Sequence, residues 1–257
     1  MRTTMKLLMI LAPALTLATT ANAACDPMPA VSNPIAAAKL IIENNAGDGD
    51  MGVHGYLDDH GWREICLYDP SGNLIVHIKP EAQFHDLGLS GVFWVSVEPE
   101  MAEWGYVDLK AAFPEGEYPV KAIALDGTGL VGAAHFTTIV PSMPEILEPA
   151  TVPEPDEGDV PVIPPGDLVV RWNPVTTSLD GRPITIVGYQ VTVEKHNYDD
   201  PHGFTRPAYD IHLGPDHTEL TVPASFFDAA STYEIELLAI ETSGNQTIGG
   251  ASFFATE

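Results

Sequence analysis

Carboxylate and amide side chains concentrate in residues 43–61, which read ENNAGDGDMGVHGYLDDHG. The candidate ligands in this stretch are Asn44, Asn45, Asp48, Asp50, Asp58 and Asp59. Ca²⁺ takes about six to eight oxygen ligands, so closely spaced Asp and Asn residues suit it. The spacing differs from an EF-hand, because placing Gly49 at the sixth position puts Ala46 at a ligand position and Gly55 where a glutamate belongs. The alternative is a polar turn before a strand, so we predict no cofactor and keep Ca²⁺ as an open alternative.

Histidine is the other metal-binding residue type with a suggestive distribution. His54 and His60 flank the acidic pair at 58–59, and residues 196–203 read HNYDDPHG. A zinc site needs three or four converging ligands, at least two of them closely spaced. His54 has no ligand-type residue two positions away on its predicted strand, so we predict no metal ligands in either segment.

Enzyme signatures are absent from the sequence. It contains no G-x-S-x-G elbow, no phosphate-binding glycine loop and no H-E-x-x-H helix. Carboxylates are so abundant that no pair can be singled out as a catalytic acid and base. We therefore predict a protein that is not an enzyme.

A candidate binding face comes from the strand predicted at 232–241, TYEIELLAIE. Alternate residues of a strand point to opposite faces, so the face that carries Tyr233 is predicted to enter the core. The opposite face and the strand predicted at 187–195 supply the candidate binding residues Leu238, Ile240, Gln190 and Thr192. Aliphatic residues pointing to water beside acids suit protein binding. The alternatives are isolated exposed aliphatics without a role, or a face covered by the first half of the chain.

The chain begins with a predicted secretory signal peptide, residues 1–23. A basic start at Arg2 and Lys6 precedes an apolar run, and Ala21-Asn22-Ala23 provides a cleavage site. This arrangement is typical of exported bacterial proteins, so we expect a periplasmic or extracellular location. A lipoprotein with a lipidated Cys25 is the alternative, although Asn22 stands where such a site has a leucine-like residue. No later stretch is long and apolar enough to span a membrane.

Two cysteines, Cys25 and Cys66, follow this segment. Exported proteins meet an oxidising compartment, so we predict a disulfide between them. The alternative is a buried free thiol at Cys66, which alternates within REICLYD.

The protein is strongly acidic, with a formal net charge of −25. Removal of residues 1–23 makes the charge −27, because this segment has two basic residues and no acidic ones. Such a surface repels nucleic acids and anionic lipids, so nucleic-acid binding is excluded as the main activity. The charge favours solubility and, as an alternative, attraction of cations.

Proline and acidic residues fill 141–166, PSMPEILEPATVPEPDEGDVPVIPPG, which predicts an extended linker. Short runs with two-residue alternation lie on both sides of it, among them 51–57, 63–69 and 249–256, and predict an all-β protein with two tandem β-sandwiches. The expected division is a signal peptide at 1–23, a first sandwich at 24–143 with a short helix near 107–113, and a second sandwich at 144–257 that includes the linker. The linker residues 144–149, PEILEP, are also expected to form the first strand of the second sandwich.

The second half resembles a fibronectin type III domain. Trp172 with the following Asn-Pro matches the second strand of that family, GYQV from Gly188 matches the third, and TYEI through AIE (232–241) matches the sixth. The resemblance implies a core built around Trp172, Tyr189 and Tyr233. One departure is FFDAAS (226–231), which replaces the usual Leu-x-Pro-Gly approach to the tyrosine.

The first half resembles an immunoglobulin-like β-sandwich through YPVKAIALDGTGLVGAAHFT (118–137). These resemblances together imply a non-enzymatic exported interaction or adhesion module with an unknown protein or glycan partner. The alternatives are a Ca²⁺-binding exported protein and an accessory module of a secreted polysaccharide-acting system, for which Trp94, Trp104 and Tyr106 would need to form an exposed platform.

Overall fold

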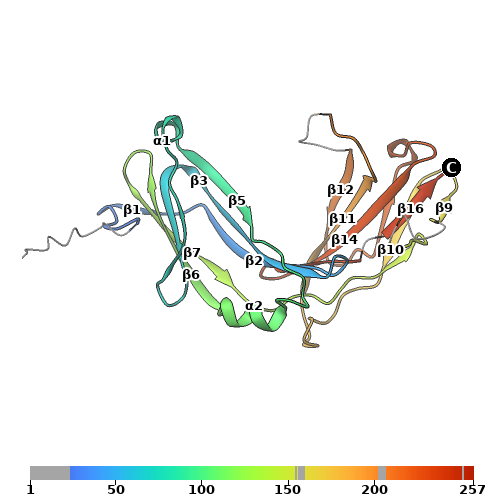
Figure 1. Cartoon of the computed structure of the whole chain (residues 1–257), viewed down its shortest axis with the longest axis horizontal. Helices are drawn as coiled ribbons and strands as arrows, with labels where there is room; N and C mark the ends of the chain where they lie inside the picture. Colours follow the sequence, from blue (N-terminus) through green and yellow to red (C-terminus); the bar gives the residue numbers. More distant parts are fainter. Residues whose placement is uncertain (1–23, 154, 156–159, 202–206, 251) are drawn as a thin grey trace, which may run out of the picture.

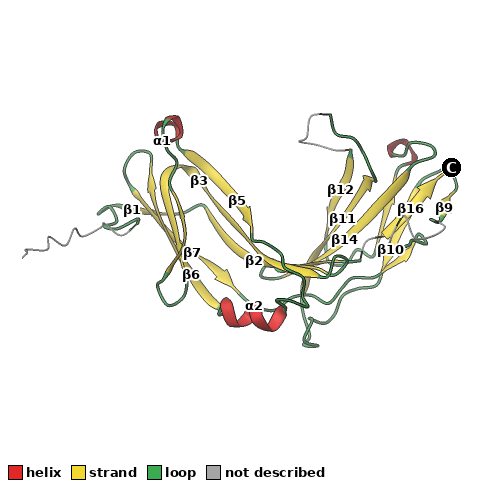
Figure 2. Ribbon diagram, in the orientation of Figure 1, coloured by secondary structure: helices red, strands yellow, loops and turns green. Residues whose placement is uncertain are grey.

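The computed structural model describes residues 24–153, 155, 160–201, 207–250 and 252–257. The signal peptide predicted at 1–23 lies outside the described residues. The described chain is mostly β-strand and forms two β-sandwiches with separate hydrophobic cores, which confirms the predicted fold class (Figure 2). The two sandwiches are the arms of a V (Figure 1). Within the described chain, no helix has the length and apolar character needed to cross a membrane.

The first arm is built from the strands and helices up to residue 136. These are β1 (Ser32–Pro34), β2 (Ala37–Asn45), β3 (Asp50–Tyr68), β4 (Leu74–Ile78), α1 (Gln83–Leu87), β5 (Leu89–Val95), α2 (Tyr106–Ala112), β6 (Gly116–Ala124) and β7 (Gly129–Phe136). The helix expected near residues 107–113 is α2. Leu109 of α2 is fully buried in the core, whereas α1 buries no residue.

Strand β3 is long because it belongs to both sheets of the first sandwich. Its first part pairs with β2 and β5, and its second part pairs with β4 and β6. The pairing register shifts between Asp58 and Trp62, and Gly61 between them has a φ of 144°. This φ is readily adopted by glycine alone. The sequence predicted two strands at 51–57 and 63–69, and the structure joins them into one bent strand.

The N-terminal segment is fastened to the outside of the second sheet. Cys25 and Cys66 form a disulfide with a Cα–Cα distance of 6.2 Å, which confirms the predicted pairing. Tyr68 donates a hydrogen bond from its hydroxyl to the carbonyl of Ala24 over 3.0 Å. The Cys25 sulfur is used by the disulfide, and a lipoprotein would need the same sulfur for its lipid. The structure therefore contradicts the lipoprotein alternative.

The second arm has two facing sheets. Its strands are β8 (Ile146–Glu148), β9 (Val162–Ile163), β10 (Leu168–Trp172), β11 (Ile186–Lys195), β12 (Ala208–Leu213), β13 (Glu219–Val222), β14 (Thr232–Glu241), β15 (Gln246–Ile248) and β16 (Ser252–Thr256), with the 3-10 helix η1 (Ala224–Phe226). One sheet has the order β13-β10-β8, and the other contains β12, β11 and β14, to which β15 and β16 pair. The side chains of Trp172, Tyr189 and Tyr233 are buried in the core between these sheets.

The approach to Tyr233 keeps the corner of the resembled family despite its different sequence. The backbone N–H of Asp228 donates a hydrogen bond of 2.7 Å to the Tyr233 hydroxyl. Phe227 packs edge-on against the Tyr233 ring, with ring centroids 5.1 Å apart. Ala230 turns the chain with a φ of 48°, a left-handed conformation in which alanine replaces the usual glycine.

The two arms share one hydrogen-bonded sheet as well as the linker. Strand β15 of the second arm pairs in parallel with β2 of the first, so the sheet runs β5-β3-β2-β15-β14-β11-β12 along the inside of the V. The side chain of Asn245 is fully buried at this joint, where it accepts from the N–H of Ile42 (2.7 Å) and donates to the carbonyls of Thr137 (2.9 Å) and Ile139 (2.8 Å). The hydroxyl of Thr247 donates to the carbonyl of Pro141. The arms are thus fixed by specific contacts in addition to the extended linker that the sequence predicted.

Candidate functional site

The candidate site is the face of the shared sheet that lines the inside of the V, here called the inner face. In the first arm it carries the cross-strand pairs Tyr56–Phe93 and His54–Val95. In the second arm it carries the residues of β14 that alternate with the core, from Glu234 to Ile240. Figure 1 shows β5 on the inside of one arm and β12 on the inside of the other. A partner that enters the V therefore meets both sandwiches.

An apolar row follows β5 on the inner face. Phe93 is 62% exposed, Val95 is 46% exposed and Val97, just beyond the strand, is 88% exposed. Tyr56 on β3 lies opposite Phe93 and is also exposed. Among the described strands β5 pairs with β3 alone, so its other edge is open. Residues 88–97, GLSGVFWVSV, contain no charged residue to protect that edge.

An apolar hollow opens beside this edge, between the two sheets of the first sandwich. It has a volume of about 290 Å³. Its walls are Trp94 and Ser96 from the β5 side, Ile75 and Val76 from β4, and Ala112 and Phe113 at the end of α2, with Leu40, Val53 and Leu67 of the core. The hollow is large enough for an apolar side chain of a partner.

Next to the apolar row, three ionisable side chains converge at the base of the first arm. The Nε2 atom of His54 lies 2.9 Å from Oε1 of Glu98 and 3.8 Å from Oε1 of Glu43. Gln246 of β15 donates from its side-chain amide to the other carboxylate oxygen of Glu43. This cluster was not predicted from the sequence, because its members come from β2, β3 and the segment after β5.

Acidic residues continue the inner face into the second arm. Glu236 of β14 has its pKa raised to about 7, first by burial and then by the negative charges of Glu234, Glu194, Glu43 and Asp48. A carboxylic acid with this pKa is partly protonated at neutral pH. At neutral pH, protonation of Glu236 therefore removes part of the negative charge of the inner face.

The predicted binding residues of the second arm lie on this face but are less open than expected. Leu238 is only 6% exposed and Thr192 is also buried, while Ile240 and Gln190 are half-buried. Leu238 pairs with Ile248 of β15, which extends the sheet beside it. The exposed apolar patch expected at Leu238 is thus wrong. A binding role of these four residues stays a prediction.

The acidic stretch at 43–61 contains the hairpin that joins β2 to β3, and Ca²⁺ binding there stays an open alternative. The side chain of Asn45 accepts hydrogen bonds from the N–H groups of Gly47 and Asp48 and donates to the Asp48 carboxylate, which makes a tight hairpin. Asp59, at the bend of β3, accepts from the N–H of Ala36. The polar-turn alternative therefore describes this hairpin. In the segment 196–203, His202 and Gly203 lie outside the described residues.

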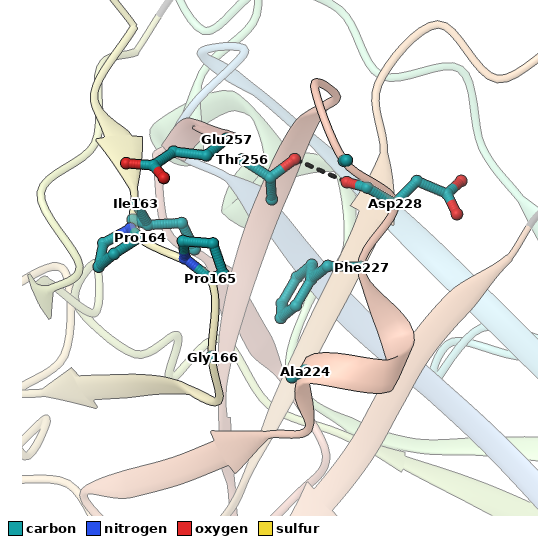
Figure 3. Close-up of a pocket in the computed structure, with 10 residues that line it drawn as sticks. Ile163, Pro164, Pro165, Gly166, Ala224, Phe227, Asp228, Thr256 and Glu257 are labelled. Carbon is teal, nitrogen blue, oxygen red and sulfur yellow. Dashed lines mark hydrogen bonds between the residues drawn. The ribbon is translucent and has the colours of Figure 1, made fainter.

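Two other features of the surface are not candidates for a functional site. Trp94, Trp104 and Tyr106 pack against the first core and do not form an exposed platform. A hollow of about 200 Å³ at the far end of the second arm lies between Phe227 and the prolines at 164 and 165 (Figure 3). The hydroxyl group of Thr256 lines this hollow and donates a hydrogen bond of 2.7 Å to the backbone carbonyl of Asp228, so it is not available to bind a ligand as a donor.

Comparison with known proteins returns similarity in structure alone. No family model matches the sequence, and no curated protein matches it. The FN1–FN3 domains of chicken CNTN1 align with 90% of this chain and 68% of that chain, at 9% identity and a TM-score of 0.36. A segment of two fibronectin type III domains from chicken tenascin aligns with 85% of this chain and 99% of that chain, at 9% identity and a TM-score of 0.30. The third fibronectin III domain of human KIAA0343 aligns with 40% of this chain and 89% of that chain, at 16% identity and a TM-score of 0.29.

Proposed function

We propose that this protein is an exported, non-enzymatic interaction module that binds a partner protein at the inner face, through strand β5. The observation that carries the proposal is the open, uncharged edge of β5 with its exposed apolar row at Phe93 and Val95. Natural proteins normally protect such an edge with charges, proline or a covering element. An edge left open in this way is suited to pairing with a strand from another chain.

The chemistry of the inner face favours a basic partner. Glu43, Glu98, Glu234 and Glu236 lie along it, and the whole chain has a formal charge of −25. This charge opposes self-pairing of two copies through β5 and attracts a positively charged chain. The partner that fits is an extended segment with alternating apolar residues and basic flanks. The apolar hollow beside β5 would take one of its side chains as an anchor.

Export and the division into domains belong to the same proposal. The Cys25–Cys66 disulfide supports an oxidising compartment, periplasmic or extracellular. The proposed domains are 24–143 and 144–257, after a signal peptide at 1–23. Each has its own core, and the aromatic residues considered for polysaccharide binding, Trp94, Trp104 and Tyr106, pack against the first of these cores.

The test uses variants that change the row and leave the core intact. Phe93→Ser with Val95→Ser removes the exposed apolar side chains, and Val107→Ser removes a still more exposed valine on α2 as the control. The proteins would be cross-linked in an extract of the exported fraction and the products identified. We expect a basic protein that is captured by the wild type and by Val107→Ser, is lost with the double variant, and is weakened by salt.

Two results would contradict the proposal. One is that every captured protein is retained by the double variant. The other is a dimer of the purified wild type in sedimentation that the double variant abolishes, because the occupant of β5 would then be a second copy of the chain.

A further inference from the structure

The cluster at the base of the inner face has the composition of a metal site. Glu43 on β2, His54 on β3 and Glu98 after β5 each place one ligand atom so that all three lie within 4.8 Å of one another. We propose that these residues hold a divalent transition-metal ion, with Zn²⁺ as the ion that fits the ligand set best. The proposal is independent of partner binding at β5.

The distances are those of a site that needs little rearrangement. Ligand atoms about 2.0–2.2 Å from a tetrahedral zinc ion lie about 3.3–3.6 Å from one another. The His54 Nε2 atom is 2.9 Å from one glutamate oxygen and 3.8 Å from the other, which bracket that separation. The two glutamate oxygens lie within 4.8 Å of each other, so side-chain adjustments would complete three ligand positions, with the fourth left for water.

Burial and packing fix the histidine. His54 is only 6% exposed although its side chain is on the inner face, away from the core of the first sandwich. The ring of Phe93 packs edge-on against the imidazole, with centroids 5.8 Å apart. The imidazole is thus held with Nε2 toward the two carboxylates, which is the orientation that a ligand needs.

A glycine makes the approach of Glu98 possible. Gly52 lies on β3 opposite Glu43. A Cβ atom at Gly52 would meet Cγ of Glu98 at 2.6 Å and its Oε1 atom at 2.7 Å. Glu98 therefore folds directly over the bare backbone of Gly52 to reach His54, and any larger residue would displace it.

The two carboxylates of the cluster have no positively charged lysine or arginine to balance them among the described residues. Among the described residues, Glu43 and Glu98 form ion pairs with His54 and with no lysine or arginine. The side-chain amide of Gln246 holds one oxygen of Glu43, so the other faces the histidine. A divalent cation would satisfy the oxygens of Glu43 and Glu98 together.

The ligand types select the ion. Ca²⁺ prefers oxygen alone, whereas an imidazole nitrogen with carboxylates suits Zn²⁺. The Ca²⁺ alternative drawn from residues 43–61 is therefore replaced here by a different ion and a different ligand set. The structure brings Cys25 and Cys66 near Glu64 as well, but both sulfurs are joined in the disulfide and cannot serve as ligands.

The test is calorimetric titration of ZnCl₂ into the purified protein, prepared without a polyhistidine tag and dialysed against EDTA. We expect one saturable site in the wild type and no saturable heat from CaCl₂ at the same concentration. Glu98→Gln and His54→Gln should each abolish saturable binding, and Gln246→Ala should weaken it about 10- to 100-fold. Melting curves without metal show whether each variant is folded, and the isosteric Glu98→Gln removes a ligand charge with the least effect on packing.

The matched control is His135→Gln. His135 forms a contact of 2.7 Å with Glu117, but both side chains are exposed and none of the described residues joins them as a third ligand. Its removal should leave zinc binding unchanged. The proposal is overturned if the wild type shows no saturable binding of Zn²⁺, if binding survives in both Glu98→Gln and His54→Gln, or if His135→Gln abolishes it. In the first case the cluster is a set of ion pairs only.

Discussion

Tyr233 contributes both an aromatic ring and a hydroxyl group to the second core. Its side chain is buried, and the hydroxyl is the acceptor for the N–H of Asp228 at 2.7 Å. Tyr233→Phe keeps the ring but leaves this N–H without its partner, so we expect a loss of about 1–3 kcal/mol in the free energy of unfolding. Urea denaturation measures the loss. Tyr209→Phe is the control, because the Tyr209 hydroxyl reaches the carbonyl of Thr221 only at 3.4 Å. Equal losses in the two variants would contradict a special role of the corner.

Glu236 makes the stability of the inner face depend on pH. Burial and neighbouring carboxylates raise its pKa from 4.5 to about 7 in the folded protein. The folded protein therefore binds this proton more tightly than the unfolded chain does, and stability falls as pH rises from about 4.5 to above 7. Glu236→Gln mimics the protonated acid. After allowance for solvent screening of about half the effect, we expect a gain of about 2 kcal/mol at pH 8, or about 4–8 °C in melting temperature.

The same substitution should change the melting temperature little at pH 4, where the acid is protonated in the folded wild type. Scanning calorimetry in EDTA at both pH values measures this difference. Glu103→Gln removes the same charge from an exposed loop and controls for net charge. A gain in Glu236→Gln that is equal at pH 4 and pH 8 would contradict the titration of Glu236 as its cause.

Residue types and alternation could predict buried residues of the core but not the cluster at His54. The predicted core residues Trp172, Tyr189 and Tyr233 are buried together because alternation along a strand fixes which face each occupies. The cluster depends on register between strands. Glu98 is 44 positions from His54 in the sequence and reaches it only because Gly52 lies between them in space. A search for ligands two residues apart along one strand could not find it.

The close packing of strand β5 against β3 depends on a second glycine of β3, Gly55. Trp94 lies opposite Gly55 in the pairing of β5 with β3, and a Cβ atom at Gly55 would meet the Trp94 ring at 1.9 Å. Gly55→Ala must therefore displace Trp94, which covers the glycine and lines the apolar hollow. We expect a loss of about 1–3 kcal/mol in the free energy of unfolding. Tryptophan fluorescence should also shift to longer wavelength in the native state.

Gly72→Ala tests whether this effect belongs to the site. Gly72 lies in an exposed turn with open space around it and a φ of 87°, so alanine there strains the backbone without displacing a side chain. It should destabilise the protein without changing the native fluorescence. An unchanged emission spectrum in Gly55→Ala would show that Trp94 does not cover this glycine.

The elements themselves were largely predictable, and the failures have local causes. Polar residues at the bend of β3, Asp58 to Gly61, resemble a turn, so one strand appeared as two. In the second arm the strand expected at 249–256 is β16, which begins at Ser252, and the sequence did not predict the short strand β15 before it. Both strands pair with β14, at different parts of it. Alternation detects a pleated segment, but it does not show where a strand changes partner.

The V shape of the whole molecule was beyond prediction from the sequence. Proline and acidic residues in 141–166 predicted an extended connection. The contacts that fix the arms lie elsewhere: Asn245 and Ile42 are 203 positions apart in the sequence. Neither the parallel pairing of β2 with β15 nor the buried amide has a local sequence signal. Orientation of the arms is therefore set by long-range hydrogen bonds, and it determines whether the inner face acts as one surface.

Asn245 gives this arrangement a direct test. Its buried amide joins the N–H of Ile42 to the carbonyls of Thr137 and Ile139. Asn245→Ala leaves these groups without partners, so we expect about 2–4 kcal/mol less stability at the joint. In calorimetry the wild type should unfold in one transition, whereas the variant should unfold in two, as each sandwich melts by itself. Small-angle scattering should show a larger radius of gyration. Asn173→Ala, which removes an exposed amide bonded to Glu145, should leave both measurements unchanged, and a variant at Asn245 that still melts in one transition with the wild-type radius would contradict a fixed joint.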